Sequence, residues 1–172
     1  MTLMVQANVL PVLQTRRNSP TTLDLLKLTK HPFFLVFDYG CFMKGAYNNY
    51  LLGGSPYLGM CTSVTDDFVM YNSQELPVAL SDSRKAVRGH LRGEAYLVSL
   101  PTLMKMDHAY YNYRKFQRRS IMVELGDQKG RSPNPFITKA FAYIGIDHVW
   151  KELGLPTCRF FYENNKKVYE WA

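Results

Sequence analysis

The stretch with the clearest chemical potential is a short loop that follows an apolar run. Residues 33–37 read Phe-Phe-Leu-Val-Phe, which predicts a strand buried on both faces, and Gly40 and Gly45 then bracket a loop. A buried strand that ends at such a loop leaves several backbone N–H groups unpaired at one point, and these favour an anion or a carboxylate. A tight turn without a ligand is the alternative. Asp38 directly precedes the loop and either faces a pocket or caps the loop.

The composition indicates one globular domain. The chain has 172 residues, 47% of them hydrophobic and 20% charged, which is enough for one sizeable core but not for two ordinary domains. Its formal net charge of +7 permits attraction to anions, nucleic acid included, but identifies no partner. Three cysteines without a CxxC pair predict reduced thiols and a cytoplasmic protein. We expect neither a signal peptide nor a membrane span, because the apolar start lacks a basic segment and no apolar run is long enough.

The elements that must position the loop are predicted from caps, glycines and prolines. Residues 21–28 begin with a capping-box spacing and predict a short helix that ends before Pro32. Further helices are predicted over residues 46–52, 100–106 and 147–153, and strands over residues 57–64, 68–71, 91–98, 120–124 and 139–145. Residues 159–171 predict a hairpin with an Asn-containing turn.

Segments between residues 33 and 145 resemble one known family, in the correct order. Residues 39–48 contain Tyr-Gly-Cys-Phe, Lys-Gly and Asn at the spacing of a YG(S/T)(L/F)xxGxxN signature. This signature is typical of the gamma-glutamylcyclotransferase-like superfamily, and the AIG2-type and gamma-glutamylamine cyclotransferase branch is the most similar. Residues 91–98, with their Gly-Glu pair, and residues 100–107, with their L-x-x-L-D pattern, resemble later family segments.

The resemblance implies an α+β fold with a mixed, barrel-like β-sheet of about six strands and a few short helices. It assigns this domain to residues 33–145. Residues 1–32 are then expected to be an N-terminal extension with a short helix. Residues 146–172 are expected to be a C-terminal extension, a helix and a hairpin, packed on the same domain.

The resemblance also implies a reaction. In the family the loop amides hold the carboxylate of a glutamyl group, and a glutamate takes a proton from the substrate's amino group. The amine then attacks its own γ-carbonyl and releases 5-oxoproline, or a related lactam, and a free amine. Counted from Asp107, the family register places Tyr110 at the glutamate, Phe116 at a tyrosine and Arg118 at an arginine. The catalytic carboxylate is therefore predicted to be missing.

Three functions remain open at this point. The main prediction is a non-catalytic protein that binds a γ-glutamyl-type carboxylate or another small anion, because tyrosine is a poor base at neutral pH. The second is an active cyclotransferase with a substitute acid or base. The third is a module that binds a nucleotide or a protein. The binding positions implied for the first are Tyr39, Gly40, Cys41 and Phe42, and the substitute catalytic candidates for the second are Asp38, Glu94, Asp107 and Tyr110.

An aromatic and basic run over residues 110–119 begins where the glutamate is missing. It is either a stacking and phosphate-contacting face, with Tyr113 and Arg118 as ligand-binding candidates, or a strand edge with solvated charges and core tyrosines. The second interpretation is favoured, as is a space-filling role for Cys41 over a nucleophilic one. The four histidines lack metal-ligand spacing, so no metal is expected, and no cofactor is predicted. The oligomeric state stays open.

A structure can separate the three functions by what surrounds the loop. An active enzyme predicts that Asp38 or Glu94 faces a pocket beside the loop. A ligand-binding protein predicts a pocket lined by Tyr110, Tyr113 and a basic residue. An interaction protein predicts that side chains of the chain itself fill the pocket.

Overall fold

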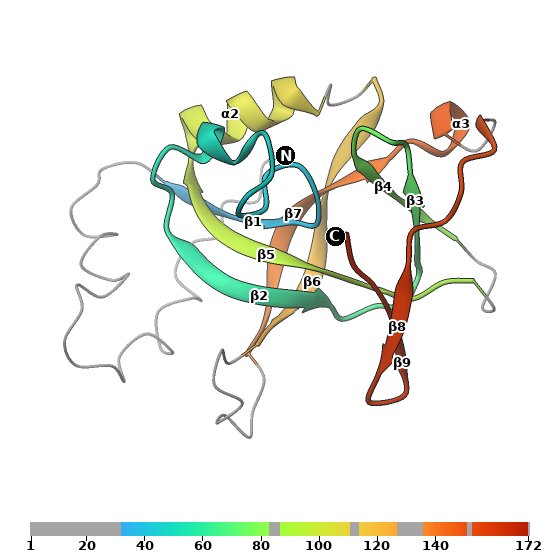
Figure 1. Cartoon of the computed structure of the whole chain (residues 1–172). Coiled ribbons are helices and arrows are strands. Elements are labelled where there is room, and N and C mark those ends of the chain that lie inside the picture. Colours follow the sequence, from blue (N-terminus) through green and yellow to red (C-terminus); the bar gives the residue numbers. More distant parts are fainter. Residues whose placement is uncertain (1–31, 83–86, 111–113, 127–135, 151–152, 172) are drawn as a thin grey trace.

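A closed barrel of five strands forms the centre of the fold (Figure 1). The computed structural model describes residues 32–82, 87–110, 114–126, 136–150 and 153–171. The barrel order is β1 (Phe33–Asp38), β7 (Phe136–Gly145), β6 (Phe116–Leu125), β2 (Tyr57–Ser63) and β5 (His90–Ser99), and β5 closes it by pairing with β1. β1 and β7 are parallel, and the other neighbours are antiparallel. The predicted mixed, barrel-like α+β fold is therefore confirmed.

Two hairpins extend this barrel. β3 (Phe68–Asn72) and β4 (Pro77–Ser81) form one, and β8 (Phe160–Glu163) and β9 (Lys166–Tyr169) form the other. β9 pairs in parallel with β5, so the C-terminal hairpin continues the barrel sheet. β3 and β4 form a separate two-stranded sheet, and the described residues hold nine strands in all where about six were predicted.

Short helices cover one outer face of the barrel. α2 (Leu100–Ala109) and η2 (Asn49–Leu52) lie side by side, and α2 also contacts β1 and β5 (Figure 1). α2 begins at Ser99, whose Oγ accepts the Thr102 N–H at 3.4 Å, as an N-cap should. No helix among the described residues is long and apolar enough to cross a membrane.

The predicted helices differ from the observed ones in extent. The predicted helix over residues 46–52 is reduced to the 3-10 helix η2, because the preceding loop makes successive three-residue turns and Gly53 ends the segment in a left-handed conformation, with φ at 53°. α3 (Asp147–Trp150) covers the first part of the predicted helix over residues 147–153. The predicted helix over residues 21–28 lies outside the described residues.

Two cores explain why the run at residues 33–37 is apolar throughout. One core holds a buried side chain from each barrel strand, namely Phe37, Ala140, Val123, Cys61 and Ala95, so it fills the barrel interior. The other lies between the outer face of the barrel and the helices. Its members include Val36, Phe42, Leu52, Tyr96, Leu103, Met106, Tyr110 and Tyr143. Successive side chains of β1 point alternately into these two cores, so both faces of the strand are apolar.

Candidate functional site

The loop after β1 is closed around the carboxylate that precedes it. Asp38 ends β1 and is 1% exposed. Its Oδ2 accepts hydrogen bonds from the backbone N–H groups of Gly40 and Phe42, both at 3.0 Å. Its Oδ1 accepts the Tyr110 hydroxyl at 2.5 Å. Two of the N–H groups predicted to hold an anion therefore bind the side chain of this chain itself.

A second carboxylate completes this closure. Glu94 is directly opposite Asp38 in the β1–β5 register, so both side chains lie on the same face of the sheet. Glu94 Oε2 accepts the Lys44 N–H at 2.6 Å and the Tyr96 hydroxyl at 2.5 Å. The loop amides at residues 40, 42 and 44 are thus all bound to internal carboxylates.

Gly93 makes the close approach of β1 and β5 possible. A Cβ atom on this residue would lie 2.1 Å from the backbone oxygen of Asp38 and 2.8 Å from Phe37 Cε2. No side chain fits such a space, so glycine is required beside Glu94. In the Gly-Glu pair found in the sequence, Gly93 therefore allows close packing of the strands and Glu94 supplies a carboxylate that binds the loop.

Tyr110 lies in the loop site, where its hydroxyl donates to Asp38. It caps the end of α2, is 2% exposed, and its ring stacks on Tyr143 at a centroid distance of 4.4 Å. Phe42 and Phe116 lie at 5.3 and 5.1 Å from the same ring. Burial and the nearby Asp38 charge raise the pKa of Tyr110 further above its ordinary value, so its hydroxyl stays a hydrogen-bond donor at neutral pH.

Burial shifts the pKa of Asp38 in the same direction as that of Tyr110. Removal from water raises the pKa of the Asp38 carboxyl, although the hydrogen bonds from Tyr110, Gly40 and Phe42 oppose this shift. The neighbouring Glu94 charge raises it further. Both carboxyl groups of the pair are buried, with Asp38 1% and Glu94 6% exposed.

The remaining loop residues have structural surroundings. Tyr39 donates its hydroxyl to the Tyr143 carbonyl and accepts the Ala79 N–H at 3.3 Å. A Cβ atom on Gly40 would lie 2.6 Å from the ring of Pro77. The Cys41 thiol lies 3.7 Å from Asn48 Nδ2, and burial raises its pKa to about 11. The thiol is therefore protonated at neutral pH.

Arg118 and Asp107 form a separate network beside Tyr143. Arg118 Nη1 lies 2.6 Å from Asp107 Oδ2, and its guanidinium lies 5.1 Å from the centroid of the Phe141 ring. The Tyr143 hydroxyl donates to Asp107 Oδ1 at 2.7 Å. This arrangement ties α2 to β6 and β7. The other ligand-binding candidate of this run, Tyr113, lies outside the described residues.

Sequence reasoning did not select three partners of this site. Tyr96 and Tyr143 bind the carboxylates of Glu94 and Asp107, and Asn49 Nδ2 donates to the Phe42 carbonyl at 2.7 Å. A signal existed for Tyr96, which follows the Gly-Glu pair at an alternate strand position. The roles of Asn49 and Tyr143 depend on contacts between distant segments, which the sequence does not reveal.

A groove of about 450 Å³ lies outside the loop site, between η2 and α2. None of the predicted site residues lines it. It is mostly apolar, with one lysine and one histidine at its wall. The lining residues are Tyr50, Leu51, Met104, Lys105, His108 and Ala109.

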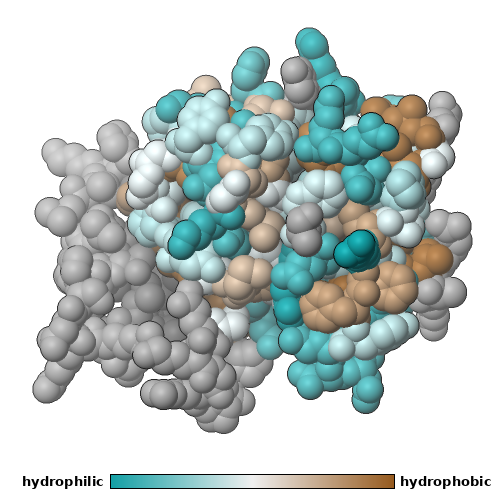
Figure 2. Space-filling model, viewed as in Figure 1, coloured by the Kyte–Doolittle hydropathy of each residue, from teal (hydrophilic) through white to brown (hydrophobic). Residues whose placement is uncertain are grey.

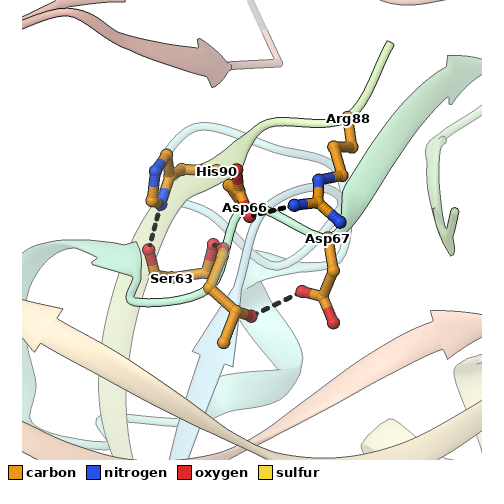
Figure 3. A network of polar contacts seen from close by, with 6 residues as sticks. Ser63, Asp66, Asp67, Arg88 and His90 are labelled. Carbon is orange, nitrogen blue, oxygen red and sulfur yellow. Dashed lines mark hydrogen bonds and ion pairs between the residues drawn. The ribbon is translucent and has the colours of Figure 1, made fainter. Parts of the chain in front are cut away.

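A second polar cluster lies where β2 ends and β5 begins (Figure 3). His90 Nδ1 is 2.8 Å from the Ser63 carbonyl oxygen, so this nitrogen carries the proton. The Ser63 hydroxyl accepts the Leu91 N–H at 2.9 Å, and Arg88 pairs with Asp66 at 3.4 Å. These contacts fix strand ends. Among the residues that the structure describes, no group of three or more metal-ligating side chains forms a metal site.

Comparison with known proteins decides the family. The model of the family described as gamma-glutamyl cyclotransferase, AIG2-like, matches residues 36–156, more than half of the chain. The chain belongs to this family. None of the curated proteins compared with the chain matches it.

Solved structures of an AIG2-like protein and of differently named proteins share the fold of this chain. An AIG2-like protein from Mus musculus is 20% identical, with a TM-score of 0.57 over 74% of this chain and 86% of that one. A uropathogenic E. coli-specific protein is 9% identical, with a TM-score of 0.54 over 73% and 87% of the two chains. Allophanate hydrolase from Kluyveromyces lactis is 12% identical, with a TM-score of 0.54, and the match covers 73% of this chain and 19% of that one. At these identities the similarity shows the fold alone.

Proposed function

We propose that this AIG2-like chain is a non-catalytic binding protein that acts through its outer surface. The observation that carries this proposal is the internal occupation of the loop. Asp38 binds the N–H groups of Gly40 and Phe42, and Tyr110 covers the same carboxylate. An external carboxylate would have to displace a buried side chain with three hydrogen bonds, which is costly.

Binding of a γ-glutamyl carboxylate or another small anion in the loop is supported less well by this geometry. The loop amides that would hold the anion are already paired, and Tyr39, Gly40, Cys41 and Phe42 are all buried. A phenol at the position assigned to the family's glutamate offers a donor where the reaction needs a base. Of the three patterns expected around the loop, a pocket filled by the chain's own side chains fits best.

An active cyclotransferase with a substitute base is the second candidate, and one observation favours it. Asp38 and Glu94 are adjacent across β1 and β5, and burial raises the pKa of Asp38. Two carboxyl groups in different environments can divide the roles of acid and base. In this candidate Glu94 would take the proton from the substrate amine.

A product assay separates these functions. Purified protein is incubated with γ-glutamyl-amines, and release of 5-oxoproline is followed chromatographically, with thermal shifts measured for the same compounds. We expect no release and no rise in melting temperature. Release by the wild-type protein that disappears in folded Asp38→Asn or Glu94→Gln variants would overturn the proposal and establish the second candidate. A ligand-dependent rise without release would establish the small-anion function instead.

A reducing, cytoplasmic location is part of the same proposal. Cys41, Cys61 and Cys158 are all buried free thiols, which suits a compartment that keeps cysteines reduced.

A further inference from the structure

β8, the outer strand of the C-terminal hairpin, has one open edge. It is the last strand of the seven-stranded sheet, so no strand among the residues that the structure describes pairs with its far side. The hairpin projects from the barrel in Figure 1, and Figure 2 shows hydrophobic side chains over the region of β8, bordered by hydrophilic ones. The hairpin also lies outside residues 36–156, which the family model matches. An open strand edge of this kind is a ready site for pairing with another strand.

The turn of the hairpin determines which backbone groups this edge presents. The two asparagines at residues 164–165 have φ angles of 50° and 62°, and positive φ at both positions is typical of a type I′ turn. The residues that flank such a turn, here Glu163 and Lys166, form a hydrogen-bonded pair. Hydrogen-bonded and non-hydrogen-bonded pairs then alternate along the two strands. The backbone N–H and C=O groups of Phe160 and Tyr162 therefore point away from β9, toward the open edge.

β8 lacks the features that usually protect an edge strand. Natural edge strands tend to carry proline, lysine or a bulge, whereas β8 begins with three aromatic residues and contains neither proline nor lysine. Phe160 and Tyr162 are 47% and 71% exposed. Phe160 is also held in place, because Lys167 Nζ lies 4.0 Å and the Tyr169 ring 5.9 Å from the centroid of its ring. The edge therefore presents an ordered, exposed and aromatic strand.

We propose that β8 pairs antiparallel with β8 of a second copy of this chain, around a twofold axis at Phe161. In this register Phe160 is opposite Tyr162 of the second copy, so the backbone groups that point to the open edge form hydrogen-bonded pairs with each other. The same two residues form aromatic pairs across the strands. Arg159, just before the strand, is opposite Glu163 of the second copy. The barrel sheets of the two copies then join into one continuous sheet.

The charges at the two ends of β8 select this register. Arg159 and Glu163 are both exposed and lie on either side of the rings, so an antiparallel copy brings each one opposite the other. Glu163 binds Arg92 of its own chain through Oε2, and Oε1 of the same carboxylate can accept Arg159 of the second copy. A shift of two residues would separate both charge pairs, and a shift of one would misalign the hydrogen-bonding groups. The edge is thus complementary to itself, as a twofold dimer requires.

This inference goes beyond the proposed function and is tested independently of it. The edge belongs to β8, whereas the loop site is formed by β1, β5 and α2. Release of 5-oxoproline would overturn the proposed function and leave the dimer untouched. Absence of a dimer would overturn this inference and leave the loop site as described.

The first test is sedimentation velocity of the full chain under reducing conditions, at concentrations from about 5 μM to about 1 mM. We expect a dimer whose share increases with concentration. Its dissociation constant should be on the order of 100 μM, because an interface of a few strand residues from each copy is below the standard size. A chain that stays monomeric up to about 1 mM would overturn the proposal.

Charge reversal tests the pair at the ends of the strand. Arg159→Glu places two carboxylates opposite each other, and Glu163→Lys places two cations opposite each other, so each variant alone should dimerise about tenfold more weakly. A mixture of the two variants should associate as the wild type does, because opposite charges then meet at both ends. Lys105→Glu is the control, with the same charge change as Arg159→Glu on an exposed residue of α2. Circular dichroism checks that each variant is folded. Equal weakening by Lys105→Glu, or no gain on mixing, would overturn the proposal.

A disulfide test measures the register directly. Phe161 would face its own copy in a non-hydrogen-bonded pair, where Cα atoms lie about 4.5 Å apart and a disulfide can form. Phe161→Cys should therefore link two chains under mild oxidation, since the native cysteines are buried. Tyr162→Cys is the matched control, because Tyr162 is 71% exposed but would lie about 8 Å from its own copy, beyond disulfide reach. Equal or faster linking of Tyr162→Cys would overturn the proposal.

Discussion

At the scale of single residues, Asp38 is a built-in ligand of its own loop. Its carboxylate takes the place of the anion that the loop amides at Gly40 and Phe42 would otherwise attract. This gives the site a chemical test that does not depend on any enzyme assay.

Removal of this carboxylate should be reversible with a small anion. Asp38→Ala leaves two buried N–H groups and the Tyr110 hydroxyl without their acceptor, at a cost of roughly 1–3 kcal/mol for each unsatisfied group. We expect a lowered melting temperature that formate raises again, while equal concentrations of chloride do not. The wild-type protein should show no such response. An equal effect of formate on both proteins would contradict the role given to Asp38.

The ionisation of Asp38 should make stability depend on pH. Burial raises its pKa in the folded protein, so the folded state binds the carboxyl proton more tightly than the unfolded state does. The contribution of this group to the free energy of unfolding is therefore largest below about pH 4, its ordinary range, and falls as the pH rises through the raised pKa.

Asp38→Asn is the matched variant for this effect, because the amide cannot ionise. We expect the free energy of unfolding of Asp38→Asn, minus that of the wild type, to increase between about pH 4 and pH 7. Urea denaturation at several pH values measures this difference and cancels the other titrating groups. A difference that stays constant, or that decreases with pH, would show that the hydrogen bonds from Tyr110 and the loop outweigh burial.

At the scale of elements, the close contact of β1 and β5 sets the position of the site. Asp38 and Glu94 reach the loop together because the two strands are in register and Gly93 allows them to approach. The helix α2 then brings Tyr110 over the loop from the other side.

Gly93→Ala should disrupt this contact strongly. Its Cβ would lie 2.1 Å from the Asp38 backbone oxygen, which cannot move without shifting β1. We expect a loss of about 3 kcal/mol or more, at or beyond the upper end of ordinary overpacking, or failure to fold. Gly126→Ala is the control, since its Cβ would lie 3.4 Å from the Met60 oxygen. Equal stabilities of the two variants in urea unfolding would contradict the packing argument.

The sequence predicts most of these elements but not how the site is filled. The apolar run of β1, the loop glycines and the start of α2 follow from local patterns. The hydrogen bond between Tyr110 and Asp38 joins residues 72 positions apart, and no local pattern encodes such a contact. The aromatic and basic run at residues 110–119 was also ambiguous, because only tertiary packing buries Tyr110 and pairs Arg118 with Asp107.

At the scale of the whole molecule, the barrel and its helices protect all three cysteines. Cys61 lies in the barrel core and Cys41 under the helices, and Cys158 is 7% exposed. Burial raises the pKa values of Cys41 and Cys158 to about 11, so little thiolate is present near pH 8.

The thiols should therefore react with a disulfide reagent only when the protein opens. We expect slow reaction of all three in the native protein and fast reaction in urea, with a midpoint that coincides with loss of the circular dichroism signal. The unfolded protein serves as the internal control for the number of thiols. Rapid reaction of one thiol under native conditions would reveal a local opening, and mapping that cysteine would identify the element that opens.

The parallel pairing of β1 with β7 also bears on how the chain is made. The Tyr39 hydroxyl donates to the carbonyl of Tyr143, 104 positions away, beside the pairing of β1 with β7. During synthesis β1 can pair with β5 well before β7 has left the ribosome. Until then the nascent barrel keeps an open edge. Such a high sequence separation predicts slow final closure, and a period in which that edge can pair with other chains.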